Sequence, residues 1–288
     1  MAAAVCITEF TDPACPFAYS AEPVRARLRW LYGEQIDFEA RMVVLSQSPQ
    51  DYLDRGFTPD KQADSFKRLA REYGMPMDTR ERPRMAASAP ACRAVIAAGL
   101  HSDRGWFLLR ALRVRHFSGD LLDEPSTITG AATDAGIDPA QLEEWMGDEA
   151  VEHRMREDMA LAREPLPAAR VLDERLANWS GGRRYTCPSY EIARRSDGVR
   201  IAVPGFQPFA AYDVVTANLV PDTPRREPPD DVREVLDWAL VPIATKEVAA
   251  IMDIELLDAR ELLVRAGAQE HPVGTDGFWT QGTDTSVQ

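Results

Sequence analysis

The sequence contains few cysteines, few histidines and no long apolar run. Only 4 of its 288 residues are cysteine and only 4 are histidine. Four cysteines in a chain of this length cannot form the dense disulfide framework of a small secreted domain. No apolar run approaches the roughly 18 residues that a membrane-spanning helix needs. The sequence therefore excludes a disulfide scaffold, and we expect no membrane partner.

Positive charge is also scarce. The 33 lysine and arginine residues stand against 46 acidic residues, which gives a formal net charge of −13. A strongly acidic surface repels nucleic acid and anionic lipid, so we expect no nucleic-acid partner. The first residues, Met-Ala-Ala-Ala-Val-Cys, lack the basic segment of a secretory signal. We therefore expect a cytoplasmic protein in a reducing compartment, where structural disulfides do not form.

The sequence contains no motif for a metal ion or a bound cofactor. No glycine-rich phosphate-binding loop follows a predicted strand. A structural zinc site needs four ligands, usually in closely spaced pairs, and neither the cysteines nor the histidines have this spacing. These residues are Cys6, Cys15, Cys92, Cys187, His101, His116, His153 and His271. We expect no metal and no bound cofactor.

The first part of the chain alternates between strand and helix patterns. Residues 5–10 form a β-favouring run, residues 16–32 a helix, and residues 36–45 a second β-rich run. Pro23 has no N–H to donate to the carbonyl of Tyr19, which predicts a kink in the helix. Strand, helix and strand at this spacing predict a βαβ unit with two parallel strands.

Helical patterns fill the chain from about residue 60 to residue 180. The predicted helices are 60–74, 86–100, 104–117, 126–135, 139–147 and 149–178. A segment of this length cannot be a loop, so we predict a helical insertion that contains no strand. A hairpin of residues 189–193 and 199–203 follows, and then a helix at 207–219. We expect residues 3–45 and 185–219 to complete one sheet.

A second, smaller domain follows a proline-rich segment. Residues 221–229 have the composition of a linker, and residues 230–288 contain three amphipathic helices and a hairpin around Gly274 and Gly277. Three helices with a two-stranded wing predict a winged-helix-like module. Eleven acidic residues against four basic ones between 229 and 282 argue against DNA binding. We expect the module to dock on the first domain, to form a homodimer, or to cover the active-site cleft.

Cys15 is the candidate nucleophile. It joins the first strand to the first helix, and Pro16 suits the first helical position. Unpaired N–H groups at a helix start favour the thiolate and so lower the pKa of a cysteine placed there. A cysteine is more often a small buried filler, which is the role that we expect for Cys6 and Cys92. The position of Cys15 favours catalysis.

Several motifs carry a family resemblance. Asp12-Pro13-Ala14-Cys15-Pro16-Phe17-Ala18-Tyr19 resembles the active-site turn of DsbA-like and FrnE-like oxidoreductases, where Cys-Pro-x-Cys opens the first helix. Tyr185-Thr186-Cys187-Pro188-Ser189-Tyr190 is similar to the segment that carries the cis-proline of that family, here Pro188. The entry to the predicted last helix, residues 203–209, also resembles the family. The resemblance spans about residues 3–220. It implies an α/β, thioredoxin-like domain over residues 1–220 with a large helical insertion, followed by the linker and the module.

The sequence departs from this family at Ala18, where the second cysteine of the motif would stand. A dithiol oxidoreductase uses that cysteine to release its substrate from the mixed disulfide. The resemblance therefore implies a thiol-dependent oxidoreductase in which Cys15 attacks and an external small thiol completes turnover. Glutathione, mycothiol or a similar thiol would be the co-substrate, and the partner would be a small thiol or disulfide.

The resemblance also assigns roles around Cys15. Pro188 and Cys187 would align an extended substrate, and Cys187 would approach Cys15 closely enough for a reversible disulfide. The substrate-binding residues would be Asp12, Pro16, Phe17, Ala18 and Tyr19. Two alternatives stay open. One is a non-catalytic protein that keeps the fold to bind a ligand or partner, and the other is an enzyme like the kappa-class glutathione transferases and chromene carboxylate isomerases.

Overall fold

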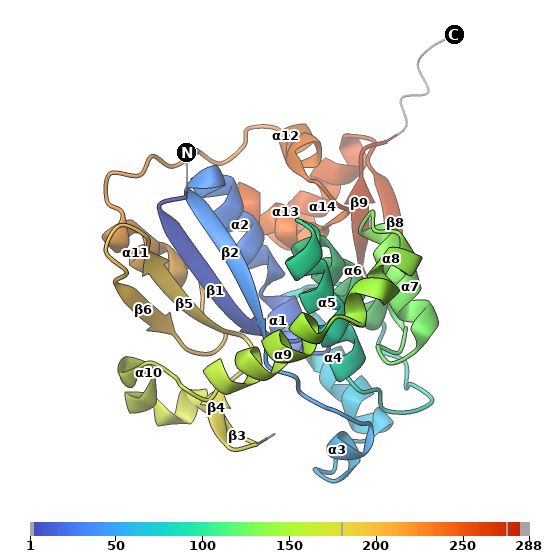
Figure 1. Ribbon diagram of the computed structural model, residues 1–288. Helices are drawn as coiled ribbons and strands as arrows, with labels where there is room; N and C mark the ends of the chain where they lie inside the picture. The colour runs from blue at the N-terminus through green and yellow to red at the C-terminus, as the bar shows by residue number, and fades with distance from the viewer. Residues whose placement is uncertain (1–2, 180, 275, 283–288) are drawn as a thin grey trace.

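A four-stranded mixed sheet at the centre of the computed structural model joins two distant parts of the chain (Figure 1). The structure describes residues 3–179, 181–274 and 276–282. The strands of the sheet are β1 (Val5–Thr11), β2 (Ile36–Met42), β5 (Ser189–Arg194) and β6 (Arg200–Val203). In the order β2-β1-β5-β6, β1 runs parallel to β2 and antiparallel to β5. The prediction that both ends of the first domain share one sheet is confirmed.

Two helices cover one face of this sheet. Val5 and Ile7 of β1 are fully buried and alternate with the partly exposed Cys6 and Thr8. The helices packed on the buried face are α2 (Glu22–Tyr32) and α11 (Phe209–Leu219). The short helix α1 (Pro16–Ser20) precedes α2 and is separated from it at Ala21. The kink predicted from Pro23 is therefore a break two residues earlier, because proline fits the first turn of a new helix.

Helices fill most of the chain between β2 and β5. They are α3 (Gln50–Leu53), α4 (Pro59–Tyr73), α5 (Ala89–His101), α6 (Gly105–Ser118), α7 (Pro125–Asp134), α8 (Pro139–Met146), α9 (Glu149–Leu161) and α10 (Pro167–Val171). The small alanine side chains of α5 allow α6, α8 and α9 to pack closely around it. Within the described ranges, no helix is long and apolar enough to cross a membrane.

The end of this insertion differs from the prediction. The pattern predicts one helix over residues 149–178, but α9 ends at Leu161. Pro165 and Pro167 prevent its continuation, because proline lacks an N–H and restricts the residue before it. The chain then forms β3 (Leu176–Asn178), which pairs antiparallel with β4 (Arg183–Tyr185). The expectation of an insertion without strands is wrong at this point. Ser180 lies outside the described residues.

The C-terminal module contains three helices and the predicted hairpin. Its elements are α12 (Val232–Trp238), β7 (Ile243–Ala244), α13 (Thr245–Met252), α14 (Leu256–Arg265), β8 (Gln269–Val273) and β9 (Asp276–Thr280). The short strand β7 adds a third strand to the hairpin, in the order β7-β9-β8. The side chain of Asp231 caps α12 by accepting from the N–H of Arg233 (2.9 Å). The turn residue Thr275 and residues 283–288 lie outside the described residues.

The module docks on α2 around one tryptophan. Trp30 of α2 is 1% exposed and belongs to the same apolar cluster as Val235, Val248 and Leu263 of the module. Of the alternatives expected for the module, the structure shows packing against the first domain. The apolar face that was a candidate for a homodimer contact is therefore covered by α2 of the same chain.

The proline-rich segment 221–229 is held against α2. Trp30 Nε1 donates to the Glu227 carbonyl (2.8 Å), and the N–H of Arg226 donates to the Leu31 carbonyl (2.8 Å). The guanidinium of Arg226 lies 3.4 Å from the centroid of the Trp30 ring. Composition predicts a linker here, whereas the structure shows a segment whose path is fixed by α2.

Buried ion pairs connect the sheet, the insertion and the module. Arg113 of α6 contacts Glu9 of β1 (2.9 Å) and Glu22 of α2. Arg110, one turn earlier, contacts Glu247 of α13 at 2.6 Å and Glu22 at 3.7 Å. Each of the five side chains is at most 6% exposed. Because breaking a buried ion pair leaves a costly unpaired charge, these contacts fix how the three parts are placed.

Candidate active site around Cys15

Cys15 is the last residue before α1, where the sequence predicts it. Its backbone is extended (φ −78°, ψ 113°), and Pro16 occupies the first helical position. Cys15 is only 4% exposed. Little of its surface is therefore open to a substrate.

The apolar cluster that contains Cys15 draws residues from the insertion as well as from the sheet and its connections. The cluster includes Tyr52 of α3, Leu161 at the end of α9, Ala169 of α10 and Leu176 of β3. None of the described residues of the C-terminal module belongs to this cluster. The expectation that the module covers the active-site cleft stays a prediction. The cluster includes residues from the end of the insertion, where the sequence pattern predicts one uninterrupted helix.

Cys187 lies beside Cys15 although 172 positions separate them in the sequence. The sulfur of Cys15 is 3.1 Å from the carbonyl oxygen of Cys187, to which the protonated thiol donates. The Cys187–Pro188 peptide bond is cis. Cys187 is itself buried, with 7% of its surface exposed. The structure thus brings together the three residues to which the resemblance assigns the catalytic site.

The two thiols hold their protons differently. Burial raises the pKa of Cys15, but hydrogen bonds from the Cys187 thiol and from the N–H groups of Ala18 and Phe17 bring this pKa below its ordinary value. Burial and the interaction with Cys15 raise the pKa of Cys187 well above its ordinary value. Of the two thiols, Cys15 therefore loses its proton more readily than Cys187.

Asp12 is buried beside Cys15 and holds three segments together. Its carboxylate accepts from the Ala14 N–H, the Leu45 N–H and the Ser88 hydroxyl, each at 2.7 Å. Burial raises the pKa of Asp12 despite these bonds, and the charge of Asp12 in turn raises the pKa of Cys15. Asp12 is 0% exposed and has no surface for a substrate. The structure gives it a positioning role in place of the expected substrate contact.

The other two cysteines differ in burial. Cys92 is fully buried on α5, and its sulfur lies 3.4 Å from Asp12 Oδ2, which agrees with the expected packing role. Cys6 is only partly buried, because it lies on the face of β1 opposite Val5 and Ile7. Its expected place in the core is therefore wrong. In the part of the chain that the structure describes, no group of three or more His, Cys, Asp or Glu side chains could hold a metal ion.

The residues of α1 divide between surface and core. Phe17 is 36% exposed and Pro16 is partly exposed, so both offer surface to a substrate. Ala18 and Tyr19 are at most 1% exposed, and the hydroxyl of Tyr19 donates to the Pro76 carbonyl (2.6 Å). The substrate contact expected of Ala18 and Tyr19 has no exposed surface to support it, because both side chains pack inside the protein.

Phe17 begins an aromatic surface that no sequence motif indicates. Its ring centroid lies 6.3 Å from that of Tyr73 at the end of α4. The Tyr73 ring lies 4.9 Å from that of Phe206, which precedes α11. These three residues come from separate parts of the chain, so only the fold brings them together.

Arg184 is a further site residue that the motifs do not reveal. It is 0% exposed, its Nη1 donates to the Tyr185 carbonyl (2.6 Å), and its guanidinium lies 4.8 Å from the Trp179 ring centroid. Its Nε and Nη2 have no hydrogen-bond partner among the described residues. Burial lowers the pKa of Arg184, whereas negative charge on Cys187 and Cys15 raises it. The only sign of this interaction in the sequence is that Arg184 lies three positions before Cys187.

The strand order and directions described above are those of a thioredoxin-like sheet. The family model of DSBA-like thioredoxin domains matches residues 6–165, which is more than half of the chain. The chain belongs to the DSBA-like thioredoxin domain family. The matched region of this DSBA-like protein contains Cys15 and most of the helical insertion.

Solved structures of DsbA-type proteins share this fold. A proposed protein disulfide isomerase from Nitrosomonas europaea has a TM-score of 0.56 at 15% identity, over 75% of this chain and 98% of that one. The cytosolic disulfide reductase DsbM from Pseudomonas aeruginosa has a TM-score of 0.52 at 18% identity, over 75% of this chain and 100% of that one. DsbM with GSH has the same TM-score at 17% identity, over 74% and 99% of the two chains. A search of curated protein sequences gives no match.

Proposed function

We propose that this DSBA-like protein is a thiol-disulfide oxidoreductase that acts through one nucleophilic cysteine, Cys15, and a small external thiol. The observation that carries the proposal is the difference between the two buried thiols. Hydrogen bonds at Cys15 lower its pKa, whereas the pKa of Cys187 is raised. Because the thiolate is the nucleophile in disulfide exchange, the site supplies one attacking sulfur and one donor beside it.

The proposed reaction has two exchange steps. The Cys15 thiolate attacks one sulfur of a disulfide RS–SR, forms the mixed disulfide Cys15–S–SR and releases RS⁻. A thiolate R′S⁻ of the external thiol then attacks the substrate sulfur, forms R′S–SR and returns the Cys15 thiolate. One disulfide is consumed and one is formed, so the cycle needs no other oxidant or reductant. Ala18 stands where a second thiol of the chain would otherwise perform the second step.

The surroundings of Cys15 favour small substrates. With 4% of its surface exposed, Cys15 is more accessible to a small disulfide than to the surface of a folded protein. The Nε and Nη2 nitrogens of Arg184, which have no partner among the described residues, suit the carboxylate of a thiol such as glutathione, because guanidinium and carboxylate pair strongly when buried. That DsbM from Pseudomonas aeruginosa has been solved with GSH supports the same class of co-substrate here. We place the reaction in a reducing compartment such as the cytoplasm.

Alkylation of the intact protein across pH tests the nucleophile. Samples are treated with iodoacetamide from about pH 5 to about pH 9, and the modified cysteines are identified by mass spectrometry. We expect Cys15 to react with an apparent pKa below the ~8.5 of a free cysteine, and Cys187 and Cys92 to stay unmodified. Exchange between bis(2-hydroxyethyl) disulfide and glutathione should be lost in Cys15→Ser and kept in the matched control Cys6→Ser. Exchange that survives in Cys15→Ser contradicts the proposal.

A second function, ligand binding without catalysis, is favoured by the burial of Cys15 and by Ala18. In that case glutathione binds the native protein, and Cys15→Ser binds it equally well. An inert Cys15 together with saturable glutathione binding would replace the enzyme proposal by this one. Calorimetric titration of both proteins separates the two functions.

A further inference from the structure

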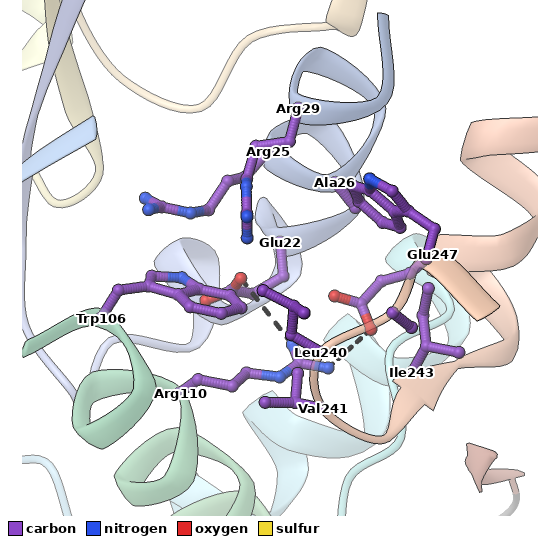
Figure 2. A pocket seen from close by; sticks show the side chains of 12 residues that line it. Glu22, Arg25, Ala26, Arg29, Trp106, Arg110, Leu240, Val241, Ile243 and Glu247 are labelled. Atoms are coloured by element: carbon purple, nitrogen blue, oxygen red, sulfur yellow. Dashed lines mark hydrogen bonds and ion pairs between the residues drawn. The ribbon is translucent and has the colours of Figure 1, made fainter. Parts of the chain in front are cut away.

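A small recess lies between α2, α6 and the segment that joins α12 to β7 (Figure 2). Its volume is about 30 Å³, which is room for roughly two water-sized atoms. The lining residues that matter here are Arg25, Arg29, Trp106, Arg110, Trp238 and Leu240. None of the residues that line the recess belongs to the apolar cluster of Cys15, so this is a separate place in the fold.

Several residues that line the recess carry buried N–H groups without a hydrogen-bond acceptor among the described residues. Nε of Arg25, Nε and Nη1 of Arg110 and Nε1 of Trp106 are buried, and none has a hydrogen-bond partner among the described residues. The guanidinium of Arg29 makes no hydrogen bond or ion pair with any residue in the described ranges. Buried polar groups in native proteins are nearly always paired, so these donors indicate a missing acceptor.

The carboxylates in the recess are already engaged. Figure 2 shows the Arg110 guanidinium between Glu22 and Glu247, at 3.7 Å and 2.6 Å. Three arginines face two carboxylates in the lining, and Arg25 also pairs with Glu9 outside it at 3.4 Å. Burial lowers the pKa of Arg25 to about 10 and lowers the pKa of Arg29 as well. A bound anion would offset the cost of burying these charged guanidinium groups, because a nearby opposite charge favours the charged form.

Two tryptophans give the recess planar apolar walls. The Arg29 guanidinium lies 4.9 Å from the ring centroid of Trp106 and 5.8 Å from that of Trp238. A wider hollow of about 600 Å³ adjoins the recess and shares both tryptophans with it. Leu240 lines both and is 66% exposed, which leaves an apolar side chain uncovered at their rim. A ligand that fits both spaces has an anionic group at one end and a flat apolar body.

We propose that this recess binds the carboxylate of a small aromatic acid. A carboxylate has two oxygens, which is what the recess can admit, and it accepts the parallel pair of N–H groups that a guanidinium offers. The ring of the acid lies in the wider hollow against Trp106, Trp238 and Leu240. Inorganic phosphate would satisfy the arginines and leave this apolar surface uncovered.

Titration of the full-length protein with benzoate tests the site. Binding is followed by tryptophan fluorescence, since two tryptophans line the recess, and by calorimetry. We expect saturable binding of one benzoate per chain, at least about tenfold tighter than acetate or inorganic phosphate. Equal affinity for all three anions, tighter binding of phosphate, or no saturation by benzoate overturns the proposal.

Matched variants assign the binding to this recess. Arg29→Gln removes one charge and breaks no ion pair, so it should fold and should weaken benzoate binding about tenfold or more. Arg71→Gln makes the same change at an exposed arginine of α4 and should leave affinity unchanged. Leu240→Ser should weaken benzoate binding without affecting acetate. Undiminished benzoate binding by Arg29→Gln, in a protein with an unchanged thermal midpoint, contradicts the proposal.

Discussion

Single residues with opposed effects determine the protonation of Cys15. The N–H groups of Phe17 and Ala18 come from the same turn of chain and stabilise the thiolate. Cys187, which lies just before β5, adds a third hydrogen-bond donor. Burial and the charge of Asp12 instead raise the pKa of Cys15. The donors prevail, and this balance explains why a buried cysteine is a candidate nucleophile.

Mild oxidation is expected to join Cys15 to Cys187. The sulfur of Cys15 lies 3.1 Å from the Cys187 carbonyl, and the two thiols affect each other's pKa, so their side chains are close. A disulfide needs Cα atoms within about 7 Å. After diamide treatment, mass spectrometry of a non-reduced digest should show the two peptides joined, and a reductant should separate them. Such a bond would protect Cys15 from oxidation to sulfinic acid.

Cys92→Ser serves as the control for this oxidation and should still form the bond, whereas Cys187→Ser should not. If the Cys15 peptide occurs only as free thiol or as a mixed disulfide with a small thiol, Cys187 has no redox role.

Sequence alone could identify Cys15 and Pro16, because the start of a helix depends on neighbouring residues. It could not indicate that Asp12 and Tyr19 are buried, since their partners Ser88 and Pro76 lie far along the chain. Nor could the sequence indicate Arg184 as a site residue, for the same reason. Its relation to the thiols exists only in the folded protein.

At the scale of elements, α6 shows how a helix with many charges can lie in the interior. Arg110, Arg113 and His116 follow one another at three-residue spacing and are at most 2% exposed. Their spacing places a charged border beside the apolar stripe of Leu108, Leu109 and Leu112. The structure buries that border because Glu9, Glu22 and Glu247 reach it from three other elements.

His116 should make the protein less stable in acid. Burial, together with the nearby charge of Arg82, lowers the pKa of His116 to about 3. The unfolded chain therefore binds a proton below about pH 6.5 that the folded protein does not bind, so stability falls as the pH falls from 6.5 towards 3. When the pH is lowered from 7 to 5, we expect His116 to reduce the free energy of unfolding by about 2 kcal/mol. Urea unfolding at both pH values measures this change.

His116→Asn keeps a donor for the Asp120 carbonyl, which His116 Nδ1 approaches at 3.2 Å, and should lose less stability over this range. His153→Asn, which replaces an exposed histidine, should behave as the unmodified protein. Equal losses in both variants would contradict the assignment.

At the scale of the whole molecule, the C-terminal module is part of the core that surrounds α2. Its three helices were predictable from apolar periodicity and its hairpin from glycine positions, because both signals are local. The sequence left three alternatives for the module: docking on the first domain, forming a homodimer or covering the cleft. The apolar face of an amphipathic helix indicates that something packs on it, but it does not identify the partner. The contacts of Trp30 with the module and with segment 221–229 show that the module docks on α2, and these contacts exist only in the folded chain.

Deletion of residues 229–288 should expose Trp30 and leave Arg110 without Glu247. We expect the truncated protein to aggregate or to self-associate, because a large apolar patch becomes accessible. Size-exclusion chromatography with light scattering measures this. A soluble, monomeric truncated protein with an unchanged thermal midpoint would contradict the structural role. The intact protein should not bind duplex DNA, and salt-sensitive binding at micromolar affinity would overturn the argument from charge.

The position of β1 has a consequence for biosynthesis. β1 lies between β2 and β5, and β5 is made only after the whole insertion. At about 5–20 residues per second, the ribosome needs on the order of ten seconds to pass from one strand to the other. Throughout that time, the edge of β1 that awaits β5 is open on the nascent chain, and such an edge readily pairs with other chains. We therefore expect the yield of folded protein to depend on chaperones that bind the nascent chain at the ribosome, even if the folded protein is stable.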